Sequence, residues 1–227
     1  MEDIRYDVIF SCRRSISIIV RPDKSVTVRA PLRTPMTTID KFVQSKTSWI
    51  RKHLNSEPGI RLAHINRKYT DGEVFLYMGK EYKLVRISSE EYFIRLREDE
   101  IHAGLKDTDD TDKVRHLISG WFYFKAREII TNEFLRITDK YSTYGFRPSG
   151  LVIRPLRSRW GSCSSGRKIT LNSELIKLDP AIIDYVIIHE LCHLKYHNHG
   201  PGFYKLLEEI VPDYKSLRKE LRKFHIR

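Results

Sequence analysis

The segment with the clearest chemical potential is residues 189–193, which are His-Glu-Leu-Cys-His and match the pattern HExxH. Histidines four residues apart on a helix lie one turn apart on the same face, so His189 and His193 can bind one metal ion. Glu190 is turned by about 100° from His189 around such a helix and can reach a water on the ion without binding the ion itself. This is the arrangement of a general base in metal-dependent hydrolysis.

A catalytic zinc ion takes three protein ligands and leaves one position open, so a third ligand is needed. His197 continues the stripe of histidines, but on a straight helix it lies about 12 Å along the axis from His189, too far for one ion. His199 lies beyond the expected end of the helix, among residues that favour a turn back. The spacing of His189, His193 and His199 equals that of metzincins, with Tyr196 in place of their turn glycine.

A second group of residues with chemical potential is the loop 157–168, RSRWGSCSSGRK. It lies in a stretch, residues 141–173, that contains six Lys or Arg residues and no Asp or Glu. Arg157 and Arg159 are candidate substrate-binding residues that polarise a carbonyl or hold a phosphate, and Trp160 is a candidate aromatic anchor. The alternative is a structural turn with solvated arginines.

The strand expected after this loop, residues 168–172, would border the metal cleft and pair through a free edge with an extended peptide. Gly161 is expected in a tight turn that leads into it. Cys163 is not expected to act as a nucleophile, because a water on the metal already supplies the attacking group. We expect Cys192 and Cys12 to be small buried hydrophobic residues.

Hydrophobic periodicity predicts both strands and helices, with most of the strands in the first half of the chain. Alternating patterns predict strands over residues 4–11, 14–21 and 24–30, four short strands between 73 and 104, and extended pieces over 151–155 and 168–172. Helical patterns predict helices over residues 38–54 and 113–141, a helix that begins at Pro180, a break at 200–202, and an amphipathic stretch over 203–225 bent at Pro212.

The candidate domain boundary is the acidic, polar segment Lys106–Asp112, KDTDDTD. It divides the chain into a β-rich N-terminal region with one helix, residues 1–106, and a catalytic region, residues 107–227. The same segment would also serve as a loop with an N-cap for the next helix, in which case the two regions pack as one unit. Either way, the fold class is α+β.

Composition excludes several classes of protein. The chain has 227 residues, 41% of them hydrophobic, so it can bury a core and is not disordered over most of its length. No apolar run approaches the roughly 18 residues that span a bilayer. The N-terminus, MEDIRYDVIF, lacks the basic and apolar regions of a signal peptide. We therefore expect a cytoplasmic protein with no membrane partner, and its three cysteines fit reduced thiols.

The charge balance favours polyanionic partners. The formal net charge is +12, from 41 Lys and Arg against 29 Asp and Glu. Residues 11–70 are the most unbalanced part, with 13 basic and 3 acidic residues. The alternative is a basic surface that maintains solubility.

The segment from Arg159 to Tyr204, which contains WGSC, ITLNSELIKLDP and HELCHLKYHNHGPGFY, resembles the signature of the YgjP-like metallopeptidase family, related to the SprT-like zincins. A weaker similarity covers ISIIVRPDKSVTVRAP, SWIRKHL and YMGKEYKL, so the resemblance extends over most of the chain. Two positions depart from the family pattern, namely Tyr204, where Trp is frequent, and Gly200, where Ser is frequent.

The resemblance implies a β-rich N-terminal part joined to a minimal zincin-like core that binds one catalytic Zn²⁺ and hydrolyses a polypeptide. It implies that His189, His193 and His199 are the zinc ligands. It also implies that Glu190 is the general base for a metal-activated water that attacks a peptide carbonyl. Members of the family are classed as peptidases by motif, and some carry a nucleotide pyrophosphatase label.

Two other functions would keep the same metal site. One is a metal-dependent nucleoside triphosphate pyrophosphatase, suggested by the acid-free basic loop, although no phosphate-cradling glycine motif supports it. The other is a protease associated with nucleic acid, suggested by the net charge, although no known nucleic-acid-binding motif is present.

Overall fold

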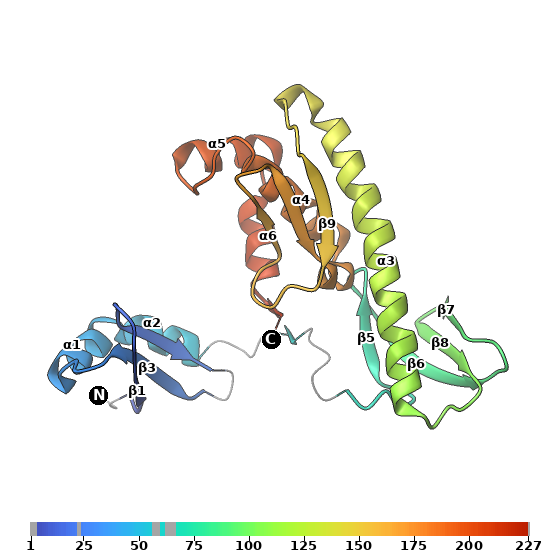
Figure 1. Ribbon diagram of the computed structural model, residues 1–227, viewed down its shortest axis with the longest axis horizontal. Helices are drawn as coiled ribbons and strands as arrows, with labels where there is room; N and C mark the ends of the chain where they lie inside the picture. Colours follow the sequence, from blue (N-terminus) through green and yellow to red (C-terminus); the bar gives the residue numbers. More distant parts are fainter. Residues whose placement is uncertain (1–3, 22–23, 56–59, 62–66, 227) are drawn as a thin grey trace. The chain divides into compact units, whose positions relative to one another are not determined.

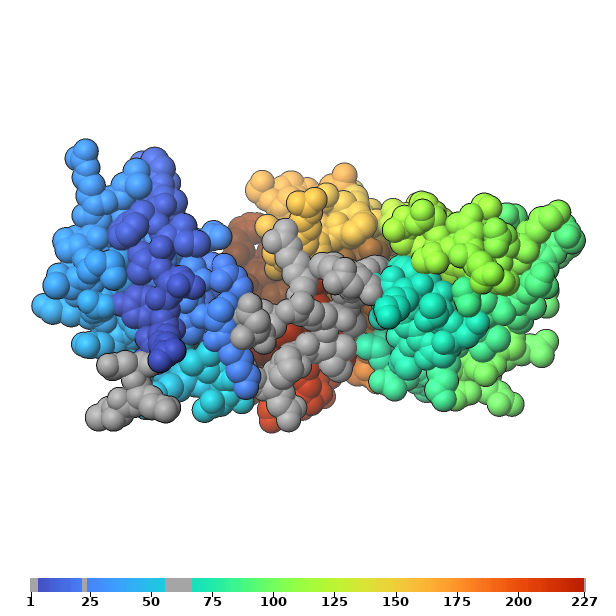
Figure 2. All heavy atoms as spheres, turned by 90° about the horizontal axis from the view of Figure 1, so that it is seen from below, coloured from blue at the N-terminus to red at the C-terminus, as the bar shows by residue number. Residues whose placement is uncertain are grey.

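The computed structural model of the protein describes residues 4–21, 24–55 and 67–226, and the backbone of residues 60–61 (Figure 1). The other residues are grey in the space-filling view of Figure 2. Contacts between residues divide the chain into two compact units, Met1–Pro58 and Gly59–Arg227. Each unit encloses its own cluster of buried apolar side chains.

In the first unit, three strands and two helices enclose an aliphatic core. The central strand β3 (Val26–Pro31) is parallel to β1 (Asp7–Ser11) and antiparallel to β2 (Ser17–Val20). The helices α1 (Met36–Ser45) and α2 (Thr47–Leu54) contribute to the same core. Its buried residues are Val26, Val28, Ala30, Ile39, Val43 and Ile50. The three strands predicted from alternation are thereby confirmed.

The single helix expected over residues 38–54 is divided at Lys46, which has φ −110° and ψ 9°. Two hydroxyl groups next to this position bond to helix carbonyls. Ser45 Oγ donates to the carbonyl of Phe42 at 2.7 Å, and Thr47 Oγ1 donates to the carbonyl of Val43 at 3.4 Å. Such side-chain bonds compete with the main-chain hydrogen bonds of a helix, which accounts for the break.

The second unit begins with a four-stranded sheet packed on a long helix. Its strands are β5 (Val74–Tyr77), β6 (Lys80–Ser88), β7 (Phe93–Arg97) and β8 (Glu100–Leu105). They lie in the order β5-β6-β8-β7, and β6 and β8 are parallel. The helix is α3 (Thr111–Lys140). Leu84 and Ile101 of the sheet belong to the same buried cluster as Val114 and Ile118 of α3.

The boundary expected between residues 106 and 107 therefore falls inside the second unit, because the sheet buries its apolar face against α3. The segment Lys106–Asp112 is a loop and a helix cap: the Asp110 side chain accepts a hydrogen bond from the Lys113 main-chain N–H at 3.0 Å. The division between compact units lies at Pro58 instead.

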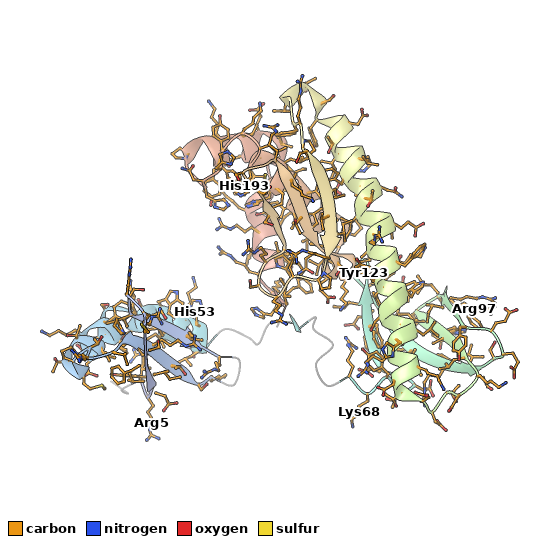
Figure 3. All side chains as sticks on the ribbon, in the orientation of Figure 1. Arg5, His53, Lys68, Arg97, Tyr123 and His193 are labelled. Atoms are coloured by element: carbon orange, nitrogen blue, oxygen red, sulfur yellow. The ribbon has the colours of Figure 1, made fainter. Side chains whose placement is uncertain are left out.

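A three-stranded sheet and the helix α4 (Pro180–Cys192) pack on the same long helix. The strands are β9 (Gly150–Arg154), β10 (Gly161–Cys163) and β11 (Lys168–Asn172), with β11 in the middle, parallel to β9 and antiparallel to β10. Figure 1 shows the four-stranded sheet beside the N-terminal half of α3, and β9 with α4 beside its C-terminal half. Arg136 of α3 forms an ion pair with Asp184 of α4 at 2.6 Å. Tyr123 of α3, labelled in Figure 3, donates a hydrogen bond to the Ile153 carbonyl of β9 at 3.4 Å.

The C-terminal part forms two helices and a short strand. These are α5 (Pro201–Ile210), α6 (Tyr214–Leu221) and β12 (Phe224–His225), which is parallel to β4 (Ile60–Arg61). Two 3-10 turns, η1 (Ser142–Tyr144) and η2 (Ser173–Lys177), complete the unit. The bend predicted at Pro212 is confirmed. The break predicted at residues 200–202 is instead the start of α5, with Gly200 as the N-cap and Pro201 in the first turn, where proline is tolerated. No helix among the described residues has both the length and the apolar character to cross a membrane.

The three cysteines are free and lie in different environments. Cys192 is completely buried, so the prediction of a small hydrophobic residue is confirmed. The same prediction is wrong for Cys12, which is exposed because it lies in a bend just after the last residue of β1.

Candidate metal centre

The first two histidines are positioned by α4. The helix begins at Pro180, and the Asp179 side chain caps it by accepting a hydrogen bond from the Ala181 main-chain N–H at 2.8 Å. His193 is the C-cap and keeps helical geometry, with φ −65° and ψ −17°. The imidazoles of His189 and His193 therefore lie on one face, with ring centroids 5.0 Å apart.

The third histidine reaches the same place because the chain turns back after α4. The His199 ring centroid lies 5.0 Å from that of His189 and 4.7 Å from that of His193. One ring nitrogen from each of the three lies within 4.8 Å of the others, a spacing that could hold a metal ion. His197 lines the same cavity but does not join this group. His193, labelled in Figure 3, marks the position of the cluster.

The three imidazoles fit a metal ion in charge and spacing. Burial and the neighbouring histidines lower the pKa of His189 to about 3, and burial lowers the pKa of His199, so both rings are neutral, the form that binds metals. Nε2 of His189 lies 3.0 Å from Nε2 of His199. Two nitrogens bound to one tetrahedral ion at about 2.0–2.1 Å would lie about 3.3 Å apart, close to this distance.

The hydrogen bond at Nδ1 of an imidazole determines which ring nitrogen is available to bind a metal ion. Nδ1 of His193 lies 2.9 Å from the main-chain carbonyl oxygen of Tyr196, which can only accept a hydrogen bond. The proton is therefore on Nδ1, and the Nε2 lone pair is free for a metal. Nδ1 of His189 is buried and has no hydrogen-bond partner among the described residues.

Phe203 forms the floor under the three histidines. Its ring centroid lies 4.9 Å from that of His189, 4.6 Å from that of His193 and 4.7 Å from that of His199. The side chain is completely buried in the first turn of α5. The sequence pattern predicts no functional role for Phe203. A signal was available, because an apolar residue soon after His199 must face inwards if the chain turns back at that point.

Glu190 lies on the same helix turn as His189 and faces strand β10. The side chain is only 5% exposed, and burial raises its pKa to about 8 against an opposing effect of the Arg159 charge. A Cβ atom at Gly161 would lie 2.6 Å from Oε1 of Glu190 and 2.7 Å from its Cγ. Only glycine leaves room for the carboxyl group here. Gly161 is thus a strand residue opposite Leu171, and the tight turn expected at this position is wrong.

The histidines, Glu190 and β10 enclose one cavity of about 300 Å³. Its described lining residues are Gly161, Ser162, Cys163, His189, Glu190, His193, His197 and His199. Burial and the neighbouring Glu190 raise the pKa of Cys163. The thiol is therefore protonated at neutral pH, which agrees with the expectation that it is not a nucleophile.

The strand next to the cavity is β10 and not the strand predicted from the sequence. Residues 168–172 form β11, whose two edges are both paired, so the free edge expected for them is wrong. Just before and just after β10, the Trp160 carbonyl accepts a hydrogen bond from Asn172 and the Ser164 N–H donates one to Lys168 of β11, each at 2.9 Å. Because main-chain groups alternate along a strand, those of Gly161 and Cys163 point away from β11.

The loop between β9 and β10 is held in place by the buried side chain of Asn172. Its Oδ1 accepts from the Leu156 N–H at 3.2 Å, and its Nδ2 donates to the carbonyls of Leu156 at 3.0 Å and Arg159 at 3.1 Å.

The three candidate substrate-binding residues of this loop lie in two different places. Arg159 acts electrostatically on Glu190, whereas Arg157 and Trp160 line a different cavity.

A helix with the HExxH pattern, a third histidine beyond its end and an adjacent edge strand together define a metallopeptidase of the zincin type. The chain belongs to the YgjP-like family: the sequence model of the YgjP-like metallopeptidase domain matches residues 14–224. The family resemblance found in the sequence is thereby confirmed, and it supports a metal-dependent hydrolase that acts on polypeptides.

Two solved structures resemble parts of this chain. The metallopeptidase zymogen abylysin of Pyrococcus abyssi is 25% identical over 41% of this chain and 93% of its own, with a TM-score of 0.36. The metallopeptidase zymogen jannalysin of Methanocaldococcus jannaschii is 22% identical over 41% of this chain and 94% of its own, with a TM-score of 0.37. A comparison with curated proteins finds no match.

Proposed function

We propose that this protein is a zinc-dependent peptidase in which His189, His193 and His199 bind the ion and Glu190 is the general base. One observation carries the proposal: three imidazoles converge within 4.8 Å beside a buried carboxyl group in one cavity. Membership of the YgjP-like metallopeptidase family supports peptide hydrolysis. A ligand set of imidazoles suits zinc among the abundant divalent metals.

The chemistry is divided between the ion and the carboxyl group. Zinc held by three histidines lowers the pKa of a bound water towards about 7 and polarises a carbonyl oxygen. Glu190 accepts a proton at its carboxylate and delivers it to the nitrogen of the leaving amine. Burial raises the pKa of Glu190 to about 8 in the protein without metal, and the positive charge of a bound ion would favour the carboxylate form that accepts the proton.

The substrate would bind as an extended chain along β10. The N–H and C=O groups of Gly161 and Cys163 point away from β11, and both residues line the cavity. An extended peptide can form strand-like hydrogen bonds with these groups. Such pairing presents a peptide carbonyl to the histidine cluster and to Glu190. Arg159, which is near Glu190, is the candidate to polarise that carbonyl.

The test is cleavage of an unstructured polypeptide by zinc-loaded protein. We expect Glu190→Gln to retain zinc and to lower kcat by about 10²- to 10⁴-fold, because it removes a general base but no metal ligand. Glu91→Gln, which removes an exposed carboxylate outside the cavity, is the matched control and should keep full activity. Removal of zinc by a chelator should abolish cleavage, and added zinc should restore it. Undiminished turnover by Glu190→Gln would disprove the assignment of this residue.

A further inference from the structure

A second cavity in the second unit is larger than the metal cavity. It has a volume of about 590 Å³, against about 300 Å³ for the cavity at the histidines. Its described lining residues are Arg157, Ser158, Trp160, Tyr185, Arg218, Leu221, Arg222, Phe224, His225 and Ile226. We call it the arginine cavity. Its walls come from the loop before β10, one turn of α4, the end of α6 and the strand β12.

The arginine cavity carries positive charge that no carboxylate among its described lining residues compensates. Arg157 comes from the loop, Arg218 lies on α6, and Arg222, one turn further on, is the C-cap of that helix. No Asp or Glu is among its described lining residues, and none of the three arginines forms an ion pair within the described part of the chain. Three guanidinium groups around one space repel one another, so binding of an anion there is favourable.

The arginine cavity is separated from the histidine cluster by a single layer of side chains. Tyr185 lines the cavity and lies one helix turn before His189, with ring centroids 6.0 Å apart. On another side, Arg218 donates a hydrogen bond to the Tyr204 hydroxyl at 3.4 Å, and the Tyr204 ring lies 6.1 Å from that of His199. An anion bound in the cavity is therefore close enough to belong to the same substrate as the cleaved bond.

The position of Trp160 connects the cavity to the substrate strand. Trp160 lines the arginine cavity and immediately precedes Gly161, the first residue of β10. An extended chain that pairs with β10 passes this end of the strand. Its next side chain or its terminus can then enter a space that is lined both by apolar side chains, from Trp160, Tyr185 and Leu221, and by arginines.

We propose that the arginine cavity binds a carboxylate group of the polypeptide substrate and thereby selects acidic substrates. The proposal rests on the proposed peptidase function, since it concerns the same substrate. Guanidinium groups bind carboxylates with two parallel hydrogen bonds, and the apolar walls accommodate the aliphatic part of the same residue. The carboxylate comes either from an Asp or Glu side chain or from the free C-terminus of the peptide.

Matched peptides test the proposal. One pair differs only by Glu or Gln at each position around the scissile bond, with both ends blocked. A second pair differs only by a free or amidated C-terminus. We expect the wild-type protein to show a kcat/KM at least about tenfold higher for the acidic member of one of the two pairs, because a charged hydrogen-bonded pair discriminates strongly against a neutral isostere. The pair that responds identifies the source of the carboxylate.

The variant Arg218→Gln/Arg222→Gln should bring that ratio close to one. Arg127→Gln is the matched control, because it removes an exposed arginine from α3, outside the cavity, and should leave the ratio unchanged. Equal ratios in the wild type and the double variant would overturn the proposal, even where both proteins cleave peptides. The proposed peptidase function would then stand without the acidic preference.

A binding measurement separates the two proposals. The Glu190→Gln variant should bind the acidic peptide more tightly than the matched neutral peptide. This difference in affinity should disappear when Arg218→Gln and Arg222→Gln are introduced into the same variant. If the protein binds the acidic peptide more tightly but the wild type cleaves neither peptide, the proposed carboxylate site is supported and the proposed peptidase function is contradicted. Tight binding and turnover of nucleoside triphosphates, with no preference among peptides, would overturn the proposal in favour of a phosphate-bearing substrate.

Discussion

The two walls of the metal cavity are built in different ways. The histidine wall comes from one short segment, residues 189–203, which contains the three imidazoles and Phe203. The opposite wall is β10, which is distant in sequence from Glu190 but close enough that only a glycine fits at position 161. The loop that leads to β10 is held by Asn172, a residue of another strand.

This difference shows which parts of the site depend on local structure. The histidine wall follows from the period of a helix and one turn after it. The β10 wall exists only because distant residues pack and form hydrogen bonds with one another. Substitutions in the first wall should therefore act on metal binding, and substitutions in the second should act on stability or on turnover with the metal retained.

The largest effect is expected for His199→Ala, in the histidine wall. Loss of one of three ligands should lower zinc affinity by more than about a hundredfold, beyond the range for residues that only support a ligand. His197→Ala is the matched control and should leave affinity unchanged, because His197 lines the cavity outside the ligand group. Competition with a fluorescent zinc chelator measures both. Equal losses in the two variants would contradict the choice of third ligand.

Asn172→Ala tests the second wall through stability. The side chain is buried and makes hydrogen bonds to Leu156, Arg159 and Glu174, so its loss should cost about 2–4 kcal/mol of unfolding free energy. Asn132→Ala on the exposed side of α3 is the control, expected to change stability by less than about 0.5 kcal/mol. Urea unfolding gives both values. An unchanged midpoint for Asn172→Ala would show that the loop is held in another way.

Gly161→Ala should separate turnover from metal binding. The added methyl group would lie 2.6 Å from Oε1 of Glu190 and must displace the carboxyl group. We expect a loss in kcat of roughly tenfold to a hundredfold, because a displaced general base transfers protons poorly, with zinc content unchanged. Gly150→Ala, where a Cβ meets nothing within 4 Å, is the matched control. Loss of zinc from Gly161→Ala would mean that the two walls are not independent.

Phe203→Leu should give the smallest effect. Leucine keeps this position apolar but loses the aromatic contacts with the three imidazoles, whose ring centroids lie 4.6–4.9 Å from the phenyl centroid. We expect zinc affinity to fall by about tenfold, as for residues that orient ligands without binding metal. The global stability measured by urea unfolding separates this effect from simple loss of packing. A lower free energy of unfolding with unchanged zinc affinity would show that Phe203 contributes to the core and not to the orientation of the ligands.

Most elements of secondary structure were predictable because the apolar pattern repeats over several turns or strand residues. The strands of the first unit and the long helix α3 follow this pattern. The errors come from hydrogen bonds and packing that the pattern does not contain. Hydroxyl groups at Ser45 and Thr47 divide one expected helix into two. Of the two roles predicted for the segment Lys106–Asp112, the structure shows the helix cap and not the boundary, because the sheet before it needs α3 to cover its apolar face.

The spacing of the HExxH pattern and of His199 was sufficient to predict that three imidazoles meet, because helix geometry and a short turn act within a few residues of chain. The partners of those groups were decided by tertiary structure alone. Sequence order does not show that β10 is an edge strand, that Gly161 makes room for Glu190, or that Arg218 and Arg222 line the same cavity as Tyr185. These contacts join segments that are far apart in the chain, and only the packing of sheet, helix and C-terminal segment brings them together.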